Sequence, residues 1–151
     1  MNLRATFMIY QSMINTKATQ SNLDSYAAPK GKETILLVED EDMVREMVRE
    51  LLVTQGYKVL EASNGAEALA LCSKCNEPIH LLLTDVVMPQ MNGKELAKQI
   101  LKSYPSMKVL FMSGYTGDLV APCDASDENQ SFISKPFTAN ALRDRLRKLL
   151  D

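Results

Sequence analysis

The feature that most constrains this chain is a regular alternation of short apolar runs with segments whose apolar residues recur at helical spacing. The first run, Thr34–Val38, is β-branched and aliphatic throughout, which is typical of a strand buried on both faces. The next segment has apolar residues at i, i+3, i+4, i+7 and i+8, which predicts a helix with one core-facing stripe. Asp42 is expected to cap this helix and Gly56 to end it.

The same alternation continues to the end of the chain. Strands are expected at 57–62, 79–84, 107–112 and 132–134, with helices at 64–73, after Asn92 and after Thr138. A further helix belongs between Gly114 and Gln130, but Pro122 and a polar run make it short or irregular. Strands that alternate with helices in this way form a parallel α/β sheet with right-handed crossovers and helices on both faces.

Composition narrows the class of protein. Residues 1–32 are polar and without sustained periodicity, so we expect a disordered tail or linker there and a single folded domain at 33–151. The net charge of −2 gives no electrostatic footprint for direct nucleic-acid binding. No apolar stretch approaches the ~20 residues of a membrane span, and the opening residues do not form a signal peptide, so a cytoplasmic protein is expected.

The three cysteines and the single histidine do not predict a redox or metal site. Cys72 and Cys75 have C-x-x-C spacing, but they fall at the end of a predicted helix, where no helix N-terminus would activate a thiol. A zinc site needs four ligands, and only Cys123 and His80 are left to complete it. His80 is expected to enter a buried strand and not to act as a phosphodonor.

Polar side chains follow the ends of four predicted strands. The first strand delivers Glu39 and Asp40, the third Asp85, the fourth Ser113 and the fifth Lys135. Because ligands of parallel α/β sheets bind beyond the carboxyl ends of the strands, we expect these side chains to meet at one edge.

Each of these residues alone has a simple structural explanation, such as a helix cap or a turn. Together they predict a phosphoryl-transfer site. Three carboxylates repel one another, and a hard divalent cation such as Mg²⁺ relieves that repulsion. Asp85 is the candidate nucleophile, Lys135 a point charge for a carboxylate or a phosphoryl oxygen, and Ser113 a hydrogen-bond donor.

Four segments resemble the signature segments of two-component receiver domains. They read ILLVEDE at 35–41, TDVVMP at 84–89, MSGY at 112–115 and KPF at 135–137. The match runs from about residue 33 to the C-terminus, in the order of the family, and is similar in style to the receivers of hybrid sensor kinases. The resemblance implies a flavodoxin-like, five-stranded parallel sheet with strand order 2-1-3-4-5.

The resemblance also implies roles for individual residues. Asp85 would be the phosphoacceptor, with Ser113 and Lys135 contacting the phosphoryl group. The protein ligands of Mg²⁺ (or Mn²⁺) would be Asp40 directly, Glu39 through water, Asp85, and the backbone carbonyl of Val87. Phe132 takes the place of the family's switch aromatic, and the Lys135–Pro136 bond would be cis.

A sensor histidine kinase or a histidine phosphotransfer protein would be the phosphodonor, and the chain would signal to a downstream protein that the sequence does not name. It would not be an enzyme beyond phosphoryl transfer to itself and self-dephosphorylation, which the bulky Val87 and Tyr115 would slow. The alternatives are a pseudo-receiver that acts without phosphorylation and a haloacid-dehalogenase-like phosphatase. The phosphatase would need a second aspartate at the position of Val87. A nucleotide-binding protein would need a glycine-rich loop after the first strand.

Overall fold

The computed structural model describes residues 31–114 and 128–151. They form one parallel sheet in the order β2-β1-β3-β4-β5. The elements are β1 (Thr34–Val38), α2 (Asp42–Thr54), β2 (Lys58–Ala62), α3 (Gly65–Lys74), β3 (Leu81–Asp85), α4 (Gly93–Ser103), β4 (Lys108–Ser113), β5 (Gln130–Ser134) and α5 (Ala139–Leu150). The predicted α/β class and strand order are therefore confirmed.

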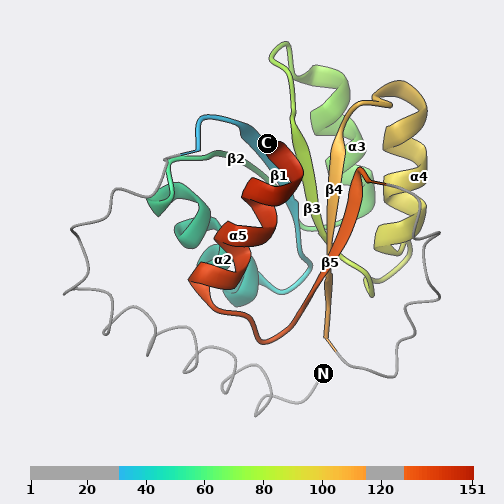
Figure 1. Cartoon of the computed structure of the whole chain (residues 1–151). Coiled ribbons are helices and arrows are strands. Elements are labelled where there is room, and N and C mark those ends of the chain that lie inside the picture. Colours follow the sequence, from blue (N-terminus) through green and yellow to red (C-terminus); the bar gives the residue numbers. More distant parts are fainter. Residues whose placement is uncertain (1–30, 115–127) are drawn as a thin grey trace.

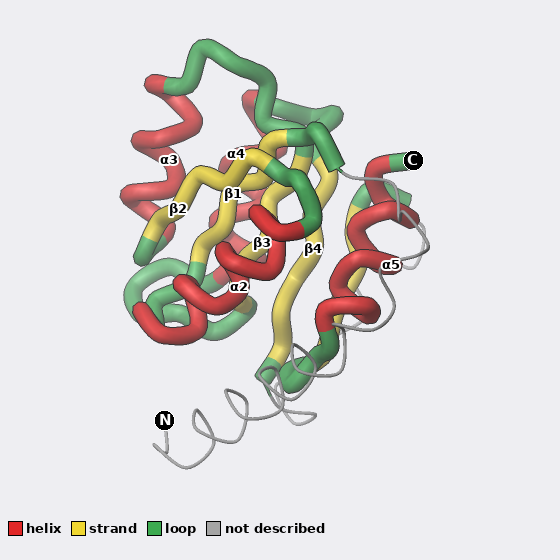
Figure 2. Tube along the Cα trace, turned by 90° about the vertical axis from the view of Figure 1, so that its left-hand side faces the viewer, coloured by secondary structure: helices red, strands yellow, loops and turns green. Residues whose placement is uncertain are grey.

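Helices cover both faces of the sheet. Helices α2 and α5 lie on one face and α3 and α4 on the other (Figure 1). Seen from the α2 side, the strands lie side by side behind α2 and α5 (Figure 2). Every residue of the central strands β1 and β3 is buried, as their uninterrupted apolar runs predict.

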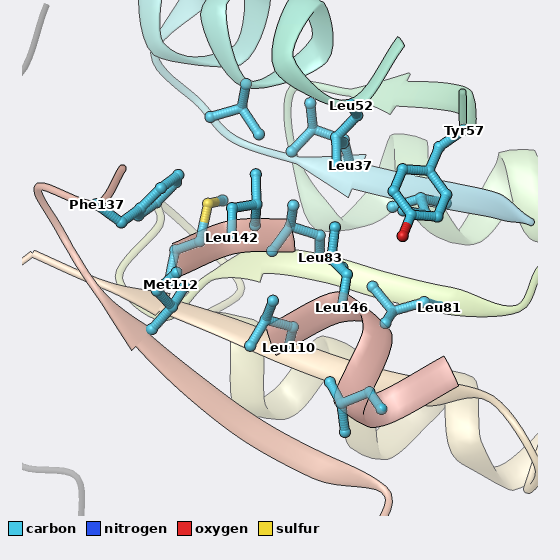
Figure 3. Close-up of a cluster of buried hydrophobic side chains, with 14 of the residues drawn as sticks. Leu37, Leu52, Tyr57, Leu81, Leu83, Leu110, Met112, Phe137, Leu142 and Leu146 are labelled. Carbon is cyan, nitrogen blue, oxygen red and sulfur yellow. The ribbon is translucent and has the colours of Figure 1, made fainter. Parts of the chain in front are cut away.

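The sheet separates two apolar cores. Leu37 and Leu83 point to the side of α2 and α5, where they pack with Leu142 and Leu146 (Figure 3). The neighbouring residues of the same strands point to the side of α3 and α4, because successive strand side chains alternate between faces. The two buried surfaces fix the register of the strands, and so the positions of the residues at their ends.

Three helices begin with a side-chain cap at the carboxyl edge of the sheet. Asn64, Asn92 and Thr138 each accept a hydrogen bond from the backbone N–H three residues further on. The prediction for Asp42 was wrong: Glu41 is the N-cap of α2 and makes no side-chain cap. Asp42 is the first helical residue, and its carboxylate binds Arg45 at 2.6 Å instead.

The C-terminal end of α2 follows the sequence pattern. Gly56 has a φ of 96°, in the left-handed region that favours glycine, and it directly follows the C-cap Gln55. The chain then turns into β2.

His80 also differs from its prediction, because it precedes β3 and is exposed. Its Nδ1 atom accepts a hydrogen bond from the N–H of Thr34, the first residue of β1, at 3.0 Å, and the side chain does not enter the core. Cys72 is buried inside α3, and burial raises the pKa of its thiol, which makes it less reactive.

Some predictions concern residues that the structure does not describe. Residues 1–30 of the tail expected at 1–32, Tyr115, Cys123 and most of the segment expected to hold the irregular helix lie outside the described residues. None of the helices in the described ranges has the length and apolar character that crossing a membrane requires.

Candidate functional site

The carboxyl ends of β1, β3, β4 and β5 bring the predicted site residues to one edge of the sheet. The register pairs Val38 with Thr84 and Ser113 with Ser134, so the residues that end or follow these strands are neighbours. Ligand oxygens of three carboxylates, those of Glu39, Asp40 and Asp85, lie within 4.8 Å of one another. The predicted convergence of the three acidic residues is thus present.

Lys135 joins the acidic cluster from β5. Its Nζ donates to Glu39 Oε2 at 2.7 Å and to Asp85 Oδ2 at 3.1 Å. All three side chains are at least 95% buried, with exposed fractions of 5% for Lys135, 0% for Glu39 and 5% for Asp85. One ammonium group therefore neutralises part of the charge of two carboxylates in a region that water scarcely reaches.

Burial changes the proton affinity of this cluster. Desolvation raises the pKa of Glu39 to about 7, and the nearby Asp85 charge adds to this, whereas Lys135 opposes it. Burial lowers the pKa of Lys135, but the Glu39 and Asp85 carboxylates outweigh it and raise that pKa above its usual value. Lys135 is accordingly charged at neutral pH, and Glu39 is poised between its two forms.

Backbone contacts hold the cluster in place. The Lys135 N–H donates to the Ser113 carbonyl at 2.7 Å, and the following Lys135–Pro136 bond is cis, as the resemblance implied. Glu39 accepts the Glu41 N–H at 3.2 Å through Oε1, while Arg45 donates to the Glu39 carbonyl at 2.8 Å. Glu39 is thus held both by the backbone of the following loop and by Arg45 of α2.

Asp40 has an oxygen without a partner. Among the described residues, its Oδ1 is one of four buried side-chain nitrogen or oxygen atoms that make no hydrogen bond. Because burying an unsatisfied carboxylate oxygen is costly, this atom is suited to a ligand beyond the protein itself. An oxygen-only donor set of several carboxylates fits a hard divalent cation such as Mg²⁺.

The loop after β3 contacts the Asp85 carboxylate through its backbone. The Val87 N–H donates to Asp85 Oδ1 at a long 3.4 Å, and the Val87 side chain is 57% exposed. Each oxygen of the Asp85 carboxylate therefore accepts one hydrogen bond, Oδ1 from the Val87 N–H and Oδ2 from Lys135.

Ser113 and Phe132 lie at the β4–β5 side of the site. Ser113 is buried at the end of β4. Phe132 pairs with Phe111 across the two strands and stacks on its ring, with centroids 5.0 Å apart and an interplanar angle of 25°. Phe132 is only partly buried, so this aromatic ring lies at the margin of the core on the α3 and α4 side.

Two residues that contact the backbone at and just after Asp85 were not among the predicted site residues. The Thr84 hydroxyl donates to the Asp85 carbonyl at 3.0 Å, and the Gly93 N–H donates to the Val86 carbonyl at 2.9 Å. Thr84 is the one hydroxyl residue in an otherwise apolar run, which was a usable signal. Gly93 offered none, because a glycine after a capping asparagine is an ordinary helix start.

Comparisons with known proteins agree with this geometry. The family model of the response regulator receiver domain matches residues 35–147. The chain is 34% identical over 134 residues to the sensor kinase CckA of Brucella abortus, covering 89% of this chain but only 14% of that kinase. It is 35% identical over 116 residues to the response regulator receiver protein CpdR of the same organism, covering 77% of this chain and 95% of CpdR.

A solved structure gives the same result. The response regulator TrrA of Thermotoga maritima, in complex with Mg²⁺–BeF, is 31% identical, with a TM-score of 0.66, and the match covers 78% of this chain and 99% of that one. Receiver domains are in general signalling modules of two-component systems and not enzymes. The fold, the strand-end residues and the match over residues 35–147 together show that this chain belongs to the response regulator receiver domain family.

Proposed function

We propose that this chain accepts a phosphoryl group on Asp85 in a reaction that depends on a divalent cation, and that the modification changes a face that binds a partner protein. The observation that carries the proposal is the sharing of Lys135 between Glu39 and Asp85, beside a partnerless oxygen of Asp40. In this arrangement the Asp85 carboxylate can react directly beside the positive charge of Lys135.

The cation is Mg²⁺ or Mn²⁺, held by Asp40, Asp85, the Val87 backbone carbonyl and, through water, Glu39. The orphaned Asp40 oxygen and the clustered carboxylates support this assignment, and TrrA was solved in complex with Mg²⁺–BeF. When bound, the cation neutralises negative charge that develops on the transferring oxygens.

The protein's own groups divide the remaining work. An oxygen of the Asp85 carboxylate forms a bond to phosphorus, while the bond between phosphorus and the donor's leaving group breaks and its electron pair leaves with the donor. The Lys135 ammonium pairs with a phosphoryl oxygen in the product, and the Ser113 hydroxyl donates a hydrogen bond to another.

A sensor histidine kinase or a histidine phosphotransfer protein supplies the phosphoryl group in the cytoplasm. Residues 33–151 form the receiver domain that accepts it, and residues 1–32 act as a tail or linker. Movement of Ser113 toward the phosphoryl group opens space into which Phe132 turns. The face formed by β5, α5 and the helix expected between Gly114 and Gln130 then presents a different surface to a downstream protein.

The decisive experiment is incubation with acetyl phosphate and Mg²⁺, followed by intact-mass measurement. The wild type is expected to gain one phosphoryl group, whereas Asp85→Asn gains none. Lys58→Met serves as a matched control, because it removes an exposed lysine of β2 that pairs with Glu77 outside the site. A wild type that gains no mass would indicate a pseudo-receiver that acts without phosphorylation.

The switch is tested separately through Phe132→Ala. This variant is expected to accept the phosphoryl group at the wild-type rate and yet to lose the change in partner binding that phosphorylation causes. A titration with the identified partner that shows unchanged coupling would contradict the role of Phe132.

The lifetime of the phosphorylated form follows from the approach to Asp85. Val87, whose backbone N–H donates to Asp85 Oδ1, and Tyr115 carry bulky side chains that would obstruct attacking water, so slow self-hydrolysis is expected. Loss of the added mass after removal of the phosphodonor measures this rate, and a half-life of seconds would refute the expectation.

A further inference from the structure

The peptide backbone around Asp85 is held more tightly than the strand ladder requires. The Val86 N–H donates to the Met112 carbonyl at 3.0 Å, which continues the β3–β4 pairing by one residue. The Val86 carbonyl accepts the Gly93 N–H at 2.9 Å, so the first residue of α4 reaches back to the loop that follows Asp85. The loop is therefore closed between the sheet and the start of a helix.

Gly93 touches the Asp85 peptide itself. A β-carbon at Gly93 would overlap with the Asp85 carbonyl oxygen and would lie 3.0 Å from the Asp85 carbonyl carbon and 3.2 Å from Thr84 Cγ2. The two nearest of these atoms belong to the Asp85 backbone, which cannot rotate away as a side chain does. Only glycine allows α4 to begin this close to Asp85.

Thr84 restrains the same carbonyl from within the strand. Its side chain is fully buried, and its hydroxyl donates to the Asp85 carbonyl oxygen at 3.0 Å. Thr84 and Gly93 thus contact one oxygen atom from two elements, and that oxygen belongs to the residue whose carboxylate binds Lys135.

We infer that Thr84 and Gly93 are positioning residues for Asp85: they fix the peptide that aims its carboxylate at Lys135 and at the cation. The inference rests on the proposed function. Neither residue touches the phosphoryl donor, so both act through the placement of Asp85. Effective placement of a nucleophile is worth a large rate factor, since a misplacement of about 1 Å can cost on the order of 100-fold.

The test compares Gly93→Ala with Gly31→Ala, a substitution of the same size at the opposite edge of the sheet. A β-carbon at Gly31 would overlap with the ring of Tyr57. Both variants are assayed under conditions where circular dichroism shows them folded. The readouts are the phosphorylation rate at saturating acetyl phosphate and Mg²⁺, and Mn²⁺ affinity measured by electron paramagnetic resonance.

Gly93→Ala is expected to displace Asp85. The maximal phosphorylation rate should then fall by about 100-fold, and Mn²⁺ should bind more weakly, because both depend on the position of the Asp85 carboxylate. Gly31→Ala is expected to retain both properties. Equal losses in the two variants, or no loss in Gly93→Ala, would overturn the inference.

Two substitutions of Thr84 test the hydroxyl. Thr84→Val keeps the branched shape and removes the donor, so the phosphorylation rate is expected to fall, whereas Thr84→Ser keeps the donor and restores it. Slow phosphorylation in Thr84→Ser with a normal rate in Thr84→Val would assign the role of Thr84 to packing and overturn its part of the inference. A wild type that binds Mn²⁺ but gains no phosphoryl group contradicts the proposed function alone, and the Mn²⁺ affinities then decide the positioning role. A wild type that does neither overturns both.

Discussion

Glu33 and Glu39 lie at opposite ends of β1, and each pairs with a basic residue from the C-terminal part of the chain. At the amino edge of the sheet, Arg147 donates to both oxygens of Glu33, at 2.9 and 3.3 Å. At the carboxyl edge, Lys135 donates to Glu39 at 2.7 Å. The residue types and the distances are similar, yet the two glutamates differ sharply in proton affinity.

The difference arises from solvent access and from neighbouring charges. The Arg147 hydrogen bond lowers the pKa of Glu33 to about 2, because it outweighs the opposing desolvation of a side chain that stays partly exposed. Burial raises the pKa of Glu39 to about 7, since its side chain is fully buried and shares Lys135 with Asp85. The Glu33–Arg147 ion pair at the amino edge therefore stabilises the fold. At the carboxyl edge, by contrast, the buried negative charge of Glu39 lowers the stability of the folded protein.

Lys135→Met is expected to have the largest effect on this contrast. Without the ammonium, Glu39 and Asp85 face each other as buried carboxylates, and the unfolding free energy is expected to fall by about 3–5 kcal/mol at pH 8. The loss shrinks at pH 5, where Glu39 can be protonated. Urea unfolding of the metal-free protein at both pH values measures this, with the exposed Lys58→Met as control. An equal loss at pH 5 and 8 would show that the charges do not cause it.

Glu39→Gln tests the sign of the pH dependence at the carboxyl edge. The folded pKa of about 7 lies above the ordinary value of 4.5, so the native state holds an extra proton between these values. Stability of the metal-free wild type is therefore expected to fall by about 3 kcal/mol as the pH rises from 4.5 through 7. Urea unfolding across this range is expected to show that the variant lacks the decline. A decline that persists in Glu39→Gln would assign it to another group.

Glu33→Gln is expected to have the smallest effect and the opposite pH window. Because the folded pKa is lowered from 4.5 to about 2, the stabilisation by Glu33 is complete above pH 4.5 and is lost as the pH falls through 2. We expect the variant to be less stable than the wild type by about 1–2 kcal/mol at pH 7, allowing for solvent screening. The two proteins should converge near pH 2 in urea unfolding. A difference that is the same at both pH values would point to lost packing.

Much of the site was predictable because strand ends in a parallel sheet must meet. The order of apolar runs placed Glu39, Asp40, Asp85 and Lys135 at one edge without any knowledge of contacts. The opposite behaviour of Glu33 and Glu39 was not predictable in the same way. Their partners lie 114 and 96 residues away along the chain, and the degree of burial depends on packing that no local pattern encodes.

Local details were missed for a related reason. His80 belongs to an apolar stretch, but a hydrogen bond to the Thr34 N–H keeps it outside the core. Asp42 has the right residue type for a cap, yet Arg45 binds its carboxylate and the helix begins one residue earlier. In both cases a specific polar contact decided the outcome over the general propensity of the residue.

Arg147 donates hydrogen bonds to residues near both ends of the described fold, which bears on where a label can be attached to the domain. Its guanidinium binds both Glu33, near where the described fold begins at Gly31, and Asp151, where it finishes. Glu33 and Asp151 thus lie close together, on the side of the sheet remote from Asp85. A fluorescent label placed near either residue would start away from the edge that carries Asp85, and so would leave the proposed phosphoryl-transfer site uncovered.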